Sequence, residues 1–333
     1  MPGEAERIER IASLARRSSD DLILGIGDDA AIIRKNDTHW WLISTDSQIE
    51  NVHFRRDYTP PRMLGHKALA VNLSDLAAMG GTPRFALLSL NLPKDIEQSF
   101  VDEILVGMVA LADQYSTILV GGDIAASGNG LAMTITIIGE CPAGRALRRD
   151  GAKLGDLIFA TGRLGLAAIG LQLLQRGHRY DPALPIHLQQ LILAHLQPTP
   201  RLEIGQRLAE RNLATSLIDI SDGLSTDLYH ICQASGVGAI VYAEDIPVAT
   251  HVPEEVNTTA LENALNGGED YELLFTVPRG RVAQIESLRA QFNDLPITLI
   301  GEITSEPGRM YLERAGERTP LRPRGHDHLR QEE

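Results

Sequence analysis

The sequence has few cysteines, few aromatic residues and no long apolar run. Its two cysteines, Cys141 and Cys232, lie far apart and outside any Cys-x-x-Cys pair, which argues against a disulfide framework and a zinc finger. No apolar stretch approaches the roughly 18 residues of a membrane-spanning helix, and the charged start Met-Pro-Gly-Glu-Ala-Glu-Arg lacks the apolar core of a signal peptide. We therefore expect a cytoplasmic protein that does not bind membranes.

The sequence also lacks an excess of positive charge. It has 31 Lys and Arg against 44 Asp and Glu, a formal net charge of −13. This balance repels the phosphates of nucleic acids and anionic membrane surfaces, so we expect no nucleic-acid partner. With 333 residues, of which 43% are hydrophobic, the chain can build about two globular domains.

Several nucleotide-binding and hydrolytic motifs are missing. No Gly-Lys dipeptide occurs, so a Walker loop is excluded, and neither His-Arg-Asp nor Asp-Phe-Gly suggests a protein kinase. A Gly-x-Ser-x-Gly nucleophile motif is absent as well. Gly25, Gly27 and Ala30 match the weak dinucleotide fingerprint, but Asp28 and Asp29 would then face the pyrophosphate with two negative charges, which argues against a Rossmann site.

Strand-like apolar runs alternate with helical patterns, which predicts an α/β or α+β chain. A polar, basic stretch at residues 144–153 separates two units, so we predict a first domain at residues 1–148 and a second at residues 149–333. In the first unit we expect strands at 40–45, 85–92, 117–120 and 131–139, and helices at 61–79 and 94–115. In the second we expect strands at 157–161, 217–220, 239–243, 271–277 and 297–303, and helices at 164–175, 186–196, 201–211, 224–235 and 282–292. The polar tail from residue 313 is expected at the surface.

Aspartates recur at the junctions between predicted strands and loops, often beside glycine. The acids in these positions are Asp28, Asp29, Asp46, Asp123, Asp219 and Asp222. Ligand sites of open α/β sheets form at strand ends, and glycine lets a ligand approach the backbone closely. Because converging carboxylates repel one another unless a cation neutralises them, the pattern predicts a site for several Mg²⁺ ions. Such a site would hold a polyphosphate.

Four further residues add to this hypothesis. Asp75 lies near the end of a helical pattern among Ala, Leu and Met residues, which favours an inward-facing ligand over an exposed acid. His53 follows the Ser-Thr-Asp segment closely and is either a site residue or a solvated loop histidine. Glu269 and Asp270 follow two glycines just before a predicted strand, where they could form a wall for the substrate.

Seven motifs, taken in order, resemble the thiamine-monophosphate kinase family over nearly the whole chain. They are GDDAA (27–31), STD (44–46), HF (53–54), KALAVNLSDLAAMG (67–80), GGD (121–123), DISDGLS (219–225) and GGEDYELLF (267–275). This family belongs to the aminoimidazole ribonucleotide synthetase-like superfamily. The resemblance implies a two-domain fold, in which an N-terminal sheet domain forms a homodimer and an α/β domain follows, with the ATP phosphates over a magnesium cluster near that interface.

The resemblance also implies roles for single residues. For Mg²⁺ binding it implies Asp29, Ser44, Thr45, Asp46, Asp75, Asp123, Asp219 and Asp222. For ATP it implies Gly122, Asp123, Arg149 and Ser221, and for thiamine monophosphate it implies His53, Glu269 and His326. Asp46, Asp123 and Arg149 are the expected catalytic residues. At His326 this chain has a histidine where the family has an aromatic cover, and its opening Gly-Glu-Ala-Glu departs from the family's Gly-Glu-Phe-Glu.

The implied activity is direct in-line transfer of the γ-phosphoryl group of ATP to thiamine monophosphate, giving thiamine diphosphate, with several Mg²⁺ ions. One alternative is another ATP-using enzyme of the superfamily, either a purine-pathway amidine-forming ligase or a selenophosphate synthetase; for the latter, neither Cys141 nor Cys232 is suitably placed. Another is a non-catalytic regulator that binds magnesium and nucleotide. A plain dimerisation module would leave the clustered acids unexplained.

Overall fold

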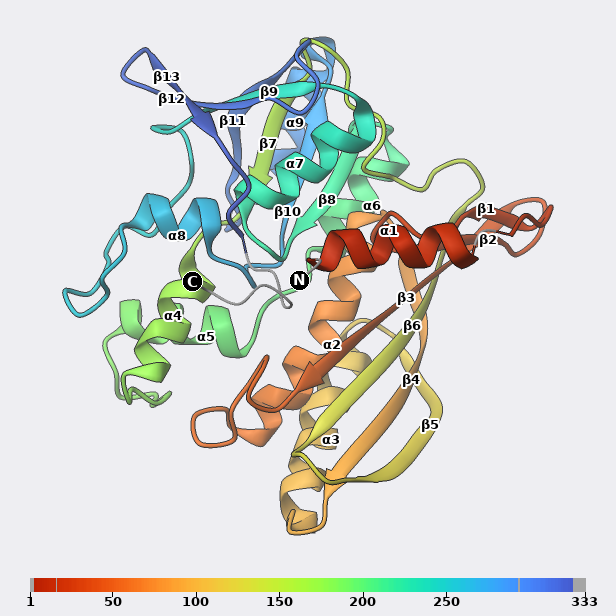
Figure 1. Cartoon of the computed structure of the whole chain (residues 1–333), viewed down its shortest axis with the longest axis vertical. Helices are drawn as coiled ribbons and strands as arrows, with labels where there is room; N and C mark the ends of the chain where they lie inside the picture. The colour runs from red at the N-terminus through yellow and green to blue at the C-terminus, as the bar shows by residue number, and fades with distance from the viewer. Residues whose placement is uncertain (1–2, 16, 293, 326–333) are drawn as a thin grey trace.

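The computed structural model describes residues 3–15, 17–292 and 294–325, and these form two β-sheets with helices around them (Figure 1). The six-stranded sheet has the order β1-β2-β3-β6-β4-β5, with bounds Leu22–Leu24, Ala31–Arg34, His39–Ile49, Ala132–Pro142, Thr82–Pro93 and Ile118–Ser127. The seven-stranded sheet has the order β13-β12-β9-β11-β7-β10-β8, with bounds Glu317–Leu321, Met310–Arg314, Gly238–Tyr242, Ile297–Thr304, Leu157–Thr161, Glu272–Val277 and Ser216–Ile220. The expected mixed α/β chain is confirmed. The division at residues 148 and 149, which lies between β6 and β7, stays a prediction.

In the described chain, helices lie between half of the pairs of consecutive strands. Their bounds are α1 Glu4–Ala15, α2 Pro61–Ala78, α3 Gln98–Gln114, α4 Leu166–Gln175, α5 Ile186–Leu196, α6 Leu202–Glu210, α7 Leu224–Ser235, α8 Ala260–Asn266 and α9 Val282–Arg289, with a 3₁₀ turn, η1, at Arg279–Arg281. The helices expected at 61–79, 186–196 and 224–235 agree with α2, α5 and α7 to within one residue. The sequence analysis did not predict α1, α8, β1 or β2.

Helix α2 is the central element of the molecule. It begins with Pro61, whose missing N–H costs nothing in the first turn, and 13 of its 18 residues are buried. A helix buried on nearly all sides needs neighbours on every face, and α2 contacts β3, β4, β6 and α3 on one side and α5, α6, β8 and β10 on the other. Gly205 of α6 permits a close approach to α2, because a Cβ there would lie 2.0 Å from the Ala77 carbonyl oxygen. Residues on α2 can therefore join groups from both sheets.

Strands β3 and β5 are longer than their sequences predicted. β3 pairs with β6 along its whole length, from His39 opposite Pro142 to Ile49 opposite Ala132. β5 pairs in parallel with β4 as far as Ser127. Asp46 and Asp123 therefore lie inside strands, and the expectation that they follow strand ends is wrong. The polar segments after residues 45 and 120 are held extended by pairing with their neighbours, which outweighs their weak strand propensity.

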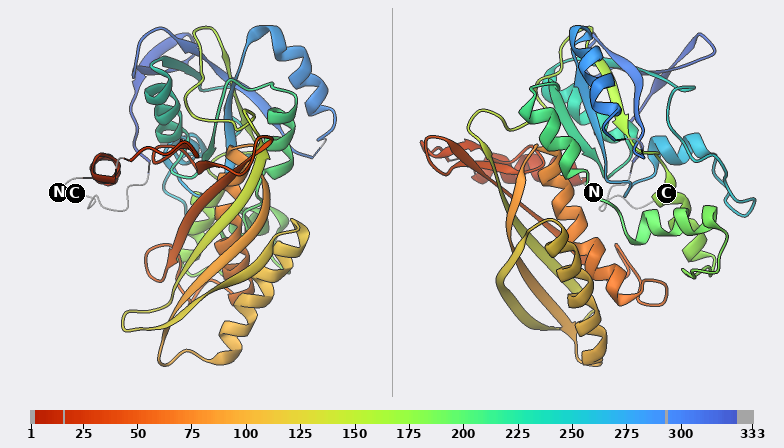
Figure 2. Two further views of the ribbon diagram at one scale, coloured as in Figure 1. Left: turned by 90° about the vertical axis from the view of Figure 1, so that its right-hand side faces the viewer. Right: turned by 180° about the vertical axis from the view of Figure 1, so that it is seen from behind.

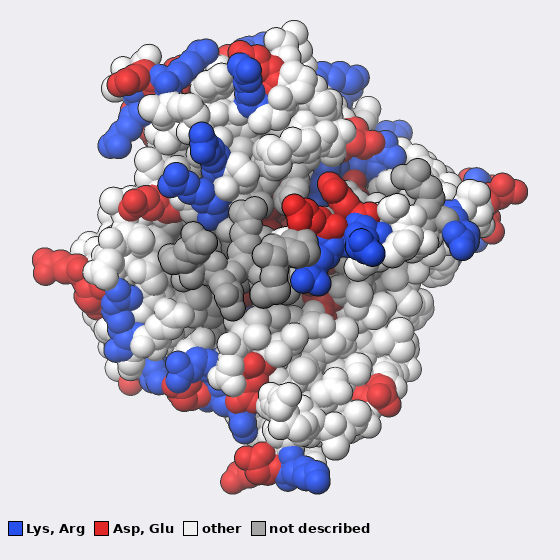
Figure 3. Space-filling view, viewed as in Figure 1, with Lys and Arg blue, Asp and Glu red and all other residues white. Residues whose placement is uncertain are grey.

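In the described chain, the six-stranded sheet has strand edges without a partner strand and one face that no helix covers, here called the bare face. β2 pairs with β3 only from Trp40 to Ile43, so in the described chain one edge of the rest of β3 has no partner strand, and neither does the outer edge of β5. Figure 2 shows α2 and α3 on one face of the sheet, and Figure 3, viewed from the opposite face, shows few charged side chains there. Apolar side chains of β5 are strongly exposed, with Ile118 at 60% and Ile124 at 73%. An exposed apolar edge strand favours pairing with another chain.

The tail of the second half forms a hairpin. β12 and β13 pair antiparallel through a turn in which Ala315 and Gly316 have positive φ. Most side chains between residues 314 and 321 are exposed, as expected for this polar segment, although the hairpin itself was not predicted. Within the described residues, no helix combines the length and the apolar character needed to cross a membrane.

Candidate active site

Three carboxylates from distant parts of the chain meet beside α2. Asp29 lies in the loop before β2, Asp75 in the last turn of α2 and Asp219 near the end of β8. One carboxylate oxygen from each lies within 4.8 Å of the others. Asp29 and Asp219 are buried and Asp75 is half-buried. The cluster therefore joins both halves of the molecule at one point.

Serine hydroxyls and an asparagine hold this cluster in place. The Ser44 hydroxyl on β3 donates to Asp75 Oδ2 at 2.5 Å, and the Ser74 hydroxyl on α2 donates to Asp219 Oδ2 at 2.6 Å. The backbone N–H of Asp46 donates to Asn72 Oδ1, whose side chain is itself fixed by donating to the Ala68 carbonyl. These bonds tie β3 and β8 to α2 at the level of the carboxylates.

Arg149 is the cation nearest to the cluster. Its guanidinium pairs with Asp29, its backbone N–H donates to Asp28 Oδ2 at 3.2 Å, and its carbonyl accepts from the Ser235 hydroxyl. Its Nε lies 3.7 Å from Asp28 Oδ1 and has no hydrogen-bond partner within the described structure. The two carboxylates therefore hold the Arg149 charge in position beside the cluster.

The acids raise one another's pKa. Burial and the charge of Asp29 raise the pKa of Asp219 to about 8, and the same two causes raise the pKa of Asp28 to about 7. Burial, followed by the charges of Asp46 and Asp219, raises the pKa of Asp75. In addition, Asp29 Oδ2 is buried without a hydrogen-bond partner in the described structure. A hard divalent cation would neutralise these charges and ligate that oxygen, so the residues present fit Mg²⁺.

This arrangement predicts an unusual pH dependence of stability. Because Asp28, Asp75 and Asp219 have a higher pKa when folded, the metal-free folded chain binds more protons than the unfolded chain, and its free energy of unfolding falls as pH rises toward about 8. His66, His195 and His230 have lowered pKa values, so they stay neutral above about pH 6.5 and do not oppose this trend. We expect the melting temperature in chelator to fall by several degrees between about pH 6.5 and about pH 8.

Thermal melts with saturating Mg²⁺ are the control. A bound cation neutralises the buried carboxylates, so they no longer take up protons in the folded protein. In Mg²⁺ the slope with pH should be much smaller than in chelator. Equal slopes in the two series would show that the acid cluster does not control this pH dependence and does not bind the ion.

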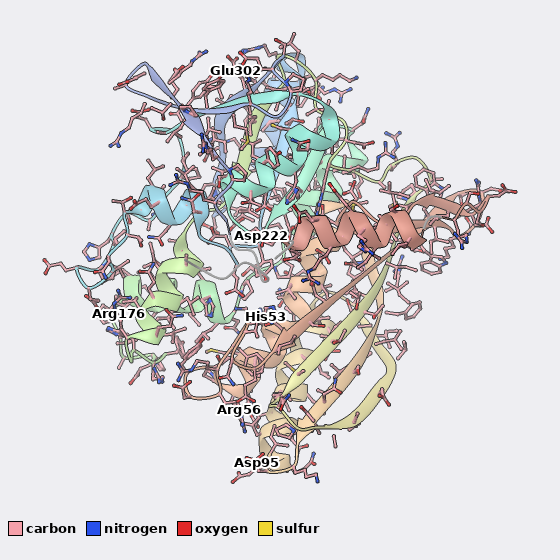
Figure 4. The ribbon with its side chains drawn as sticks, viewed as in Figure 1. His53, Arg56, Asp95, Arg176, Asp222 and Glu302 are labelled. Atoms are coloured by element: carbon pink, nitrogen blue, oxygen red, sulfur yellow. The ribbon has the colours of Figure 1, made fainter. Side chains whose placement is uncertain are left out.

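The structure places some of the other predicted residues near the cluster. Asp46 is close enough for its charge to raise the pKa of Asp75 and Asp219. Asp222 lies after β8, where one oxygen is within 4.8 Å of ligand atoms of Asp227 and His230. The sequence analysis did not assign Asp227 and His230 to the site, and both lie on α7. Figure 4 shows Asp222 and His53 in the central part of the molecule, where the two halves meet.

Gly122, Asp123 and the Thr45 side chain do not join the cluster within one chain. The Thr45 hydroxyl contacts the Thr136 hydroxyl on β6. Gly122 and Asp123 lie on β5, separated from β3 by β4 and β6, which at the usual spacing of neighbouring strands is about 14 Å. A Cβ at Gly122 would lie 1.7 Å from the Leu88 carbonyl oxygen, so glycine is needed for close pairing with β4.

Of the predicted substrate residues, the structure describes Glu269 and His53. Glu269 pairs with Lys67 of α2 and His195 of α5, two residues that the sequence analysis did not assign to the site. The Glu269 N–H donates to the carbonyl of Ser221, which joins the two predicted binding loops. His53 Nδ1 accepts from the Ile49 N–H at 3.0 Å. His326 lies outside the described residues.

Two family models match most of the chain. The N-terminal domain of AIR synthase related proteins matches residues 27–141, and the C-terminal domain matches residues 153–312. Thiamine-monophosphate kinases are among the similar curated proteins. The protein from Salmonella typhimurium is 40% identical over 328 residues, and that from Escherichia coli is 41% identical over 328 residues, with 98% of each chain covered in both comparisons.

Solved structures agree with these matches. A structure described as AaThiL complexed with AMPPCP and TMP has a TM-score of 0.83 and 35% identity, covering 98% of this chain and 97% of the other. Thiamine-monophosphate kinase from Stenotrophomonas maltophilia has a TM-score of 0.77 and 38% identity, covering 94% and 96%. The hydrogenase maturation protein HypE, at 19% identity and a TM-score of 0.69, shares the fold.

Proposed function

The chain belongs to the thiamine-monophosphate kinase family of AIR synthase related proteins, and we propose that it phosphorylates thiamine monophosphate with ATP by direct in-line transfer assisted by several Mg²⁺ ions. The observation that carries the proposal is the convergence of Asp29, Asp75 and Asp219, with a buried, unpartnered oxygen on Asp29. Such a site suits a polyphosphate held through metal. The similar AaThiL structure, described as a complex with AMPPCP and TMP, supports the choice of both substrates.

The residues of the chain divide the work between holding metal and binding anions. Asp29, Asp75 and Asp219 would hold Mg²⁺, with Ser44 and Asp46 beside them as further ligands. Asp222 lies in a second group, with Asp227 and His230, which would hold a further ion. When bound, the ions neutralise charge on the donor and acceptor phosphates. Arg149 adds a fixed positive charge beside the cluster, which suits a role at the polyphosphate of ATP.

The transfer needs no covalent enzyme intermediate. An oxygen of the acceptor phosphate attacks the γ-phosphorus of ATP, the new P–O bond forms, and the bond to the β–γ bridging oxygen breaks as ADP leaves. The acceptor phosphate is already anionic at neutral pH, so a strong general base is unnecessary. The site must instead overcome repulsion between two anions, which is the purpose of the acid-held cations and Arg149. His53, Ser221 and Glu269 would position the two substrates.

A homodimer explains why Asp123 lies away from the other acids. The unpaired edge of β5 and the unpaired edge of β3 bound the four strands β3, β6, β4 and β5 at opposite ends. Two copies related by a two-fold axis can therefore close into a barrel, in which β5 of each copy pairs with β3 of the other. The apolar, exposed β5 and the weakly charged bare face fit such closure. Asp46 lies in the same register row across the sheet as Gly122, so in such a dimer Asp123 of the partner subunit would complete each metal site.

A direct assay tests the proposed function. Purified protein is incubated with ATP, Mg²⁺ and thiamine monophosphate, and thiamine diphosphate is followed by its fluorescence after oxidation and separation. We expect product only when all three components are present. If the protein binds ATP and Mg²⁺ but forms no diphosphate, the non-catalytic regulator or another enzyme of the superfamily becomes the better assignment, and other phosphoryl acceptors should be screened.

A further inference from the structure

Two side chains converge on the Glu269 carboxylate from behind. The Lys67 ammonium of α2 lies 2.8 Å from Glu269 Oε1, and His195 Nδ1 of α5 lies 2.9 Å from Oε2, without the alignment of a full hydrogen bond. Lys67 Nζ also lies 3.5 Å from His195 Nε2. The three groups therefore form a closed cluster, in which each oxygen of the carboxylate has its own partner.

Within this cluster, Glu269 is the residue that solvent reaches. The side chains of Lys67 and His195 are each 1% exposed, whereas the side chain of Glu269 is 23% exposed. A buried ammonium needs a counter-charge, and Glu269 is its ion-pair partner in the described chain. Burial disfavours ionisation of Glu269, but the Lys67 charge and His195 outweigh it and lower the pKa of the carboxyl. Glu269 thus presents a fixed negative charge to the side from which a ligand can come.

The backbone that carries Glu269 is fixed by other contacts. Glu269 and Tyr271 both have positive φ, at 70° and 51°, which is strained for residues other than glycine. The carboxylate of the intervening Asp270 accepts from the N–H groups of Gly165 at 2.6 Å and Ala167 at 3.1 Å, at the start of α4. Lys67 and His195 therefore act on the Glu269 side chain, while separate bonds hold the loop.

The cluster also lies at a useful distance from the metal site. Lys67 and Asp75 are eight residues apart on α2, which is about 12 Å along the helix axis. Burial raises the pKa of Tyr271, and the charges of Glu269 and Asp46 raise it further, so this tyrosine is close to both sites. An extended molecule with a phosphate at one end and rings at the other can reach from Asp75 to Glu269.

We propose that Lys67 and His195 are positioning residues that hold the Glu269 carboxylate ionised and oriented toward the cationic thiazolium and aminopyrimidine rings of thiamine monophosphate. This inference rests on the proposed function. The thiazolium ring carries a permanent positive charge, so a carboxylate that stays ionised and cannot rotate away is a suitable partner for it.

Lys67→Met tests the proposal. Without the ammonium, the Glu269 carboxyl should protonate more readily, so we expect the Kd for thiamine monophosphate, measured by calorimetry, to rise about 30-fold. The loss should grow as pH is lowered from about 8 to about 6. The KM for ATP should stay within about 2-fold, because Lys67 does not reach the metal site. His195→Leu, which removes a neutral partner, should weaken binding by a smaller factor of about 5.

Three matched variants separate positioning from damage to the fold. Glu269→Gln should weaken binding without the new pH dependence, and it also reports any contribution of Tyr58, Tyr271 and Asp270, the other titratable groups near Glu269. Lys67→Met combined with Glu269→Gln should recover thermal stability and bind no more weakly than Glu269→Gln alone. Lys35→Met, which breaks an ion pair with Glu140 of β6, should change neither constant.

Two results would overturn the inference: losses that add in the double variant, or a Lys67→Met protein that binds thiamine monophosphate with a pH-independent affinity like that of the wild type. If either result is found while the wild-type protein still binds and phosphorylates thiamine monophosphate, the positioning role is wrong and the proposed function stands. A wild-type protein that binds no thiamine monophosphate contradicts the proposed function, and the inference fails with it.

Discussion

Asp75→Asn is expected to abolish formation of thiamine diphosphate and at the same time to raise the melting temperature of the metal-free protein. Asp75 shares its site with Asp29 and Asp219, and burial together with these neighbouring charges raises the pKa of its carboxyl. Asparagine has a similar shape and can accept the Ser44 hydroxyl, but it removes one repelling charge and one metal ligand. We expect kcat to fall about 10³-fold or more and the melting temperature in chelator to rise by a few degrees.

The measurements are turnover in Mg²⁺ and thermal melts with Mg²⁺ and with chelator. In the wild type, Mg²⁺ should stabilise the folded protein, and in Asp75→Asn most of this stabilisation should be lost. Asp95→Asn is the matched control, because Asp95 lies in a turn at the far end of the first sheet (Figure 4). A variant at position 75 that keeps near-wild-type turnover, or that gains as much stability from Mg²⁺ as the wild type, would contradict the metal site.

Parts of the fold and the site could be predicted because local patterns and buried contacts agree. The apolar runs of β7 and β10 are buried at every position, and α2, α5 and α7 lie within one residue of their expected bounds. The inward orientation of Asp75 could be predicted because its neighbours on α2 are apolar, so the helix has no solvent-facing side there. Glycine beside aspartate indicated where chain segments approach closely, as at Gly122 beside β4. That a ligand also approaches there stays a prediction.

Other features depend on partners that are distant in sequence. The second half of β3 is polar and the middle of β5 contains Gly121, Gly122 and Asp123, so both segments have weak strand propensity and become strands through pairing with β6 and β4. Lys67 and His195 are 128 residues apart, and neither has a local pattern that predicts a contact with Glu269. In the homodimer that we propose, the position of Asp123 relative to the other acids depends on how two chains assemble, and the sequence of acids in one chain does not encode this.

Mixing two inactive variants is expected to restore activity if the partner subunit supplies Asp123. Asp123→Asn and Asp75→Asn should each be inactive alone, because each lacks a ligand in both sites of its dimer. In a mixed dimer, one site carries both changes and the other carries neither. Random exchange gives about half mixed dimers, each with one intact site, so turnover should recover to about a quarter of that of the wild type. The assay is thiamine diphosphate formation after co-expression or after subunit exchange.

Asp46→Asn mixed with Asp75→Asn is the matched control. Asp46 and Asp75 belong to the same site of one subunit, because the charge of Asp46 raises the pKa of Asp75. Asp46 also bonds Asn72 of α2, and Asp75 bonds Ser44 of β3. Every site of a mixed dimer would therefore still carry one change. No recovery is expected from this pair. Recovery with Asp123→Asn but not with Asp46→Asn would place Asp123 across the dimer interface. Absence of recovery from Asp123→Asn, in dimers shown to contain both variants, would contradict barrel closure through β5 and β3 and require another role for Asp123.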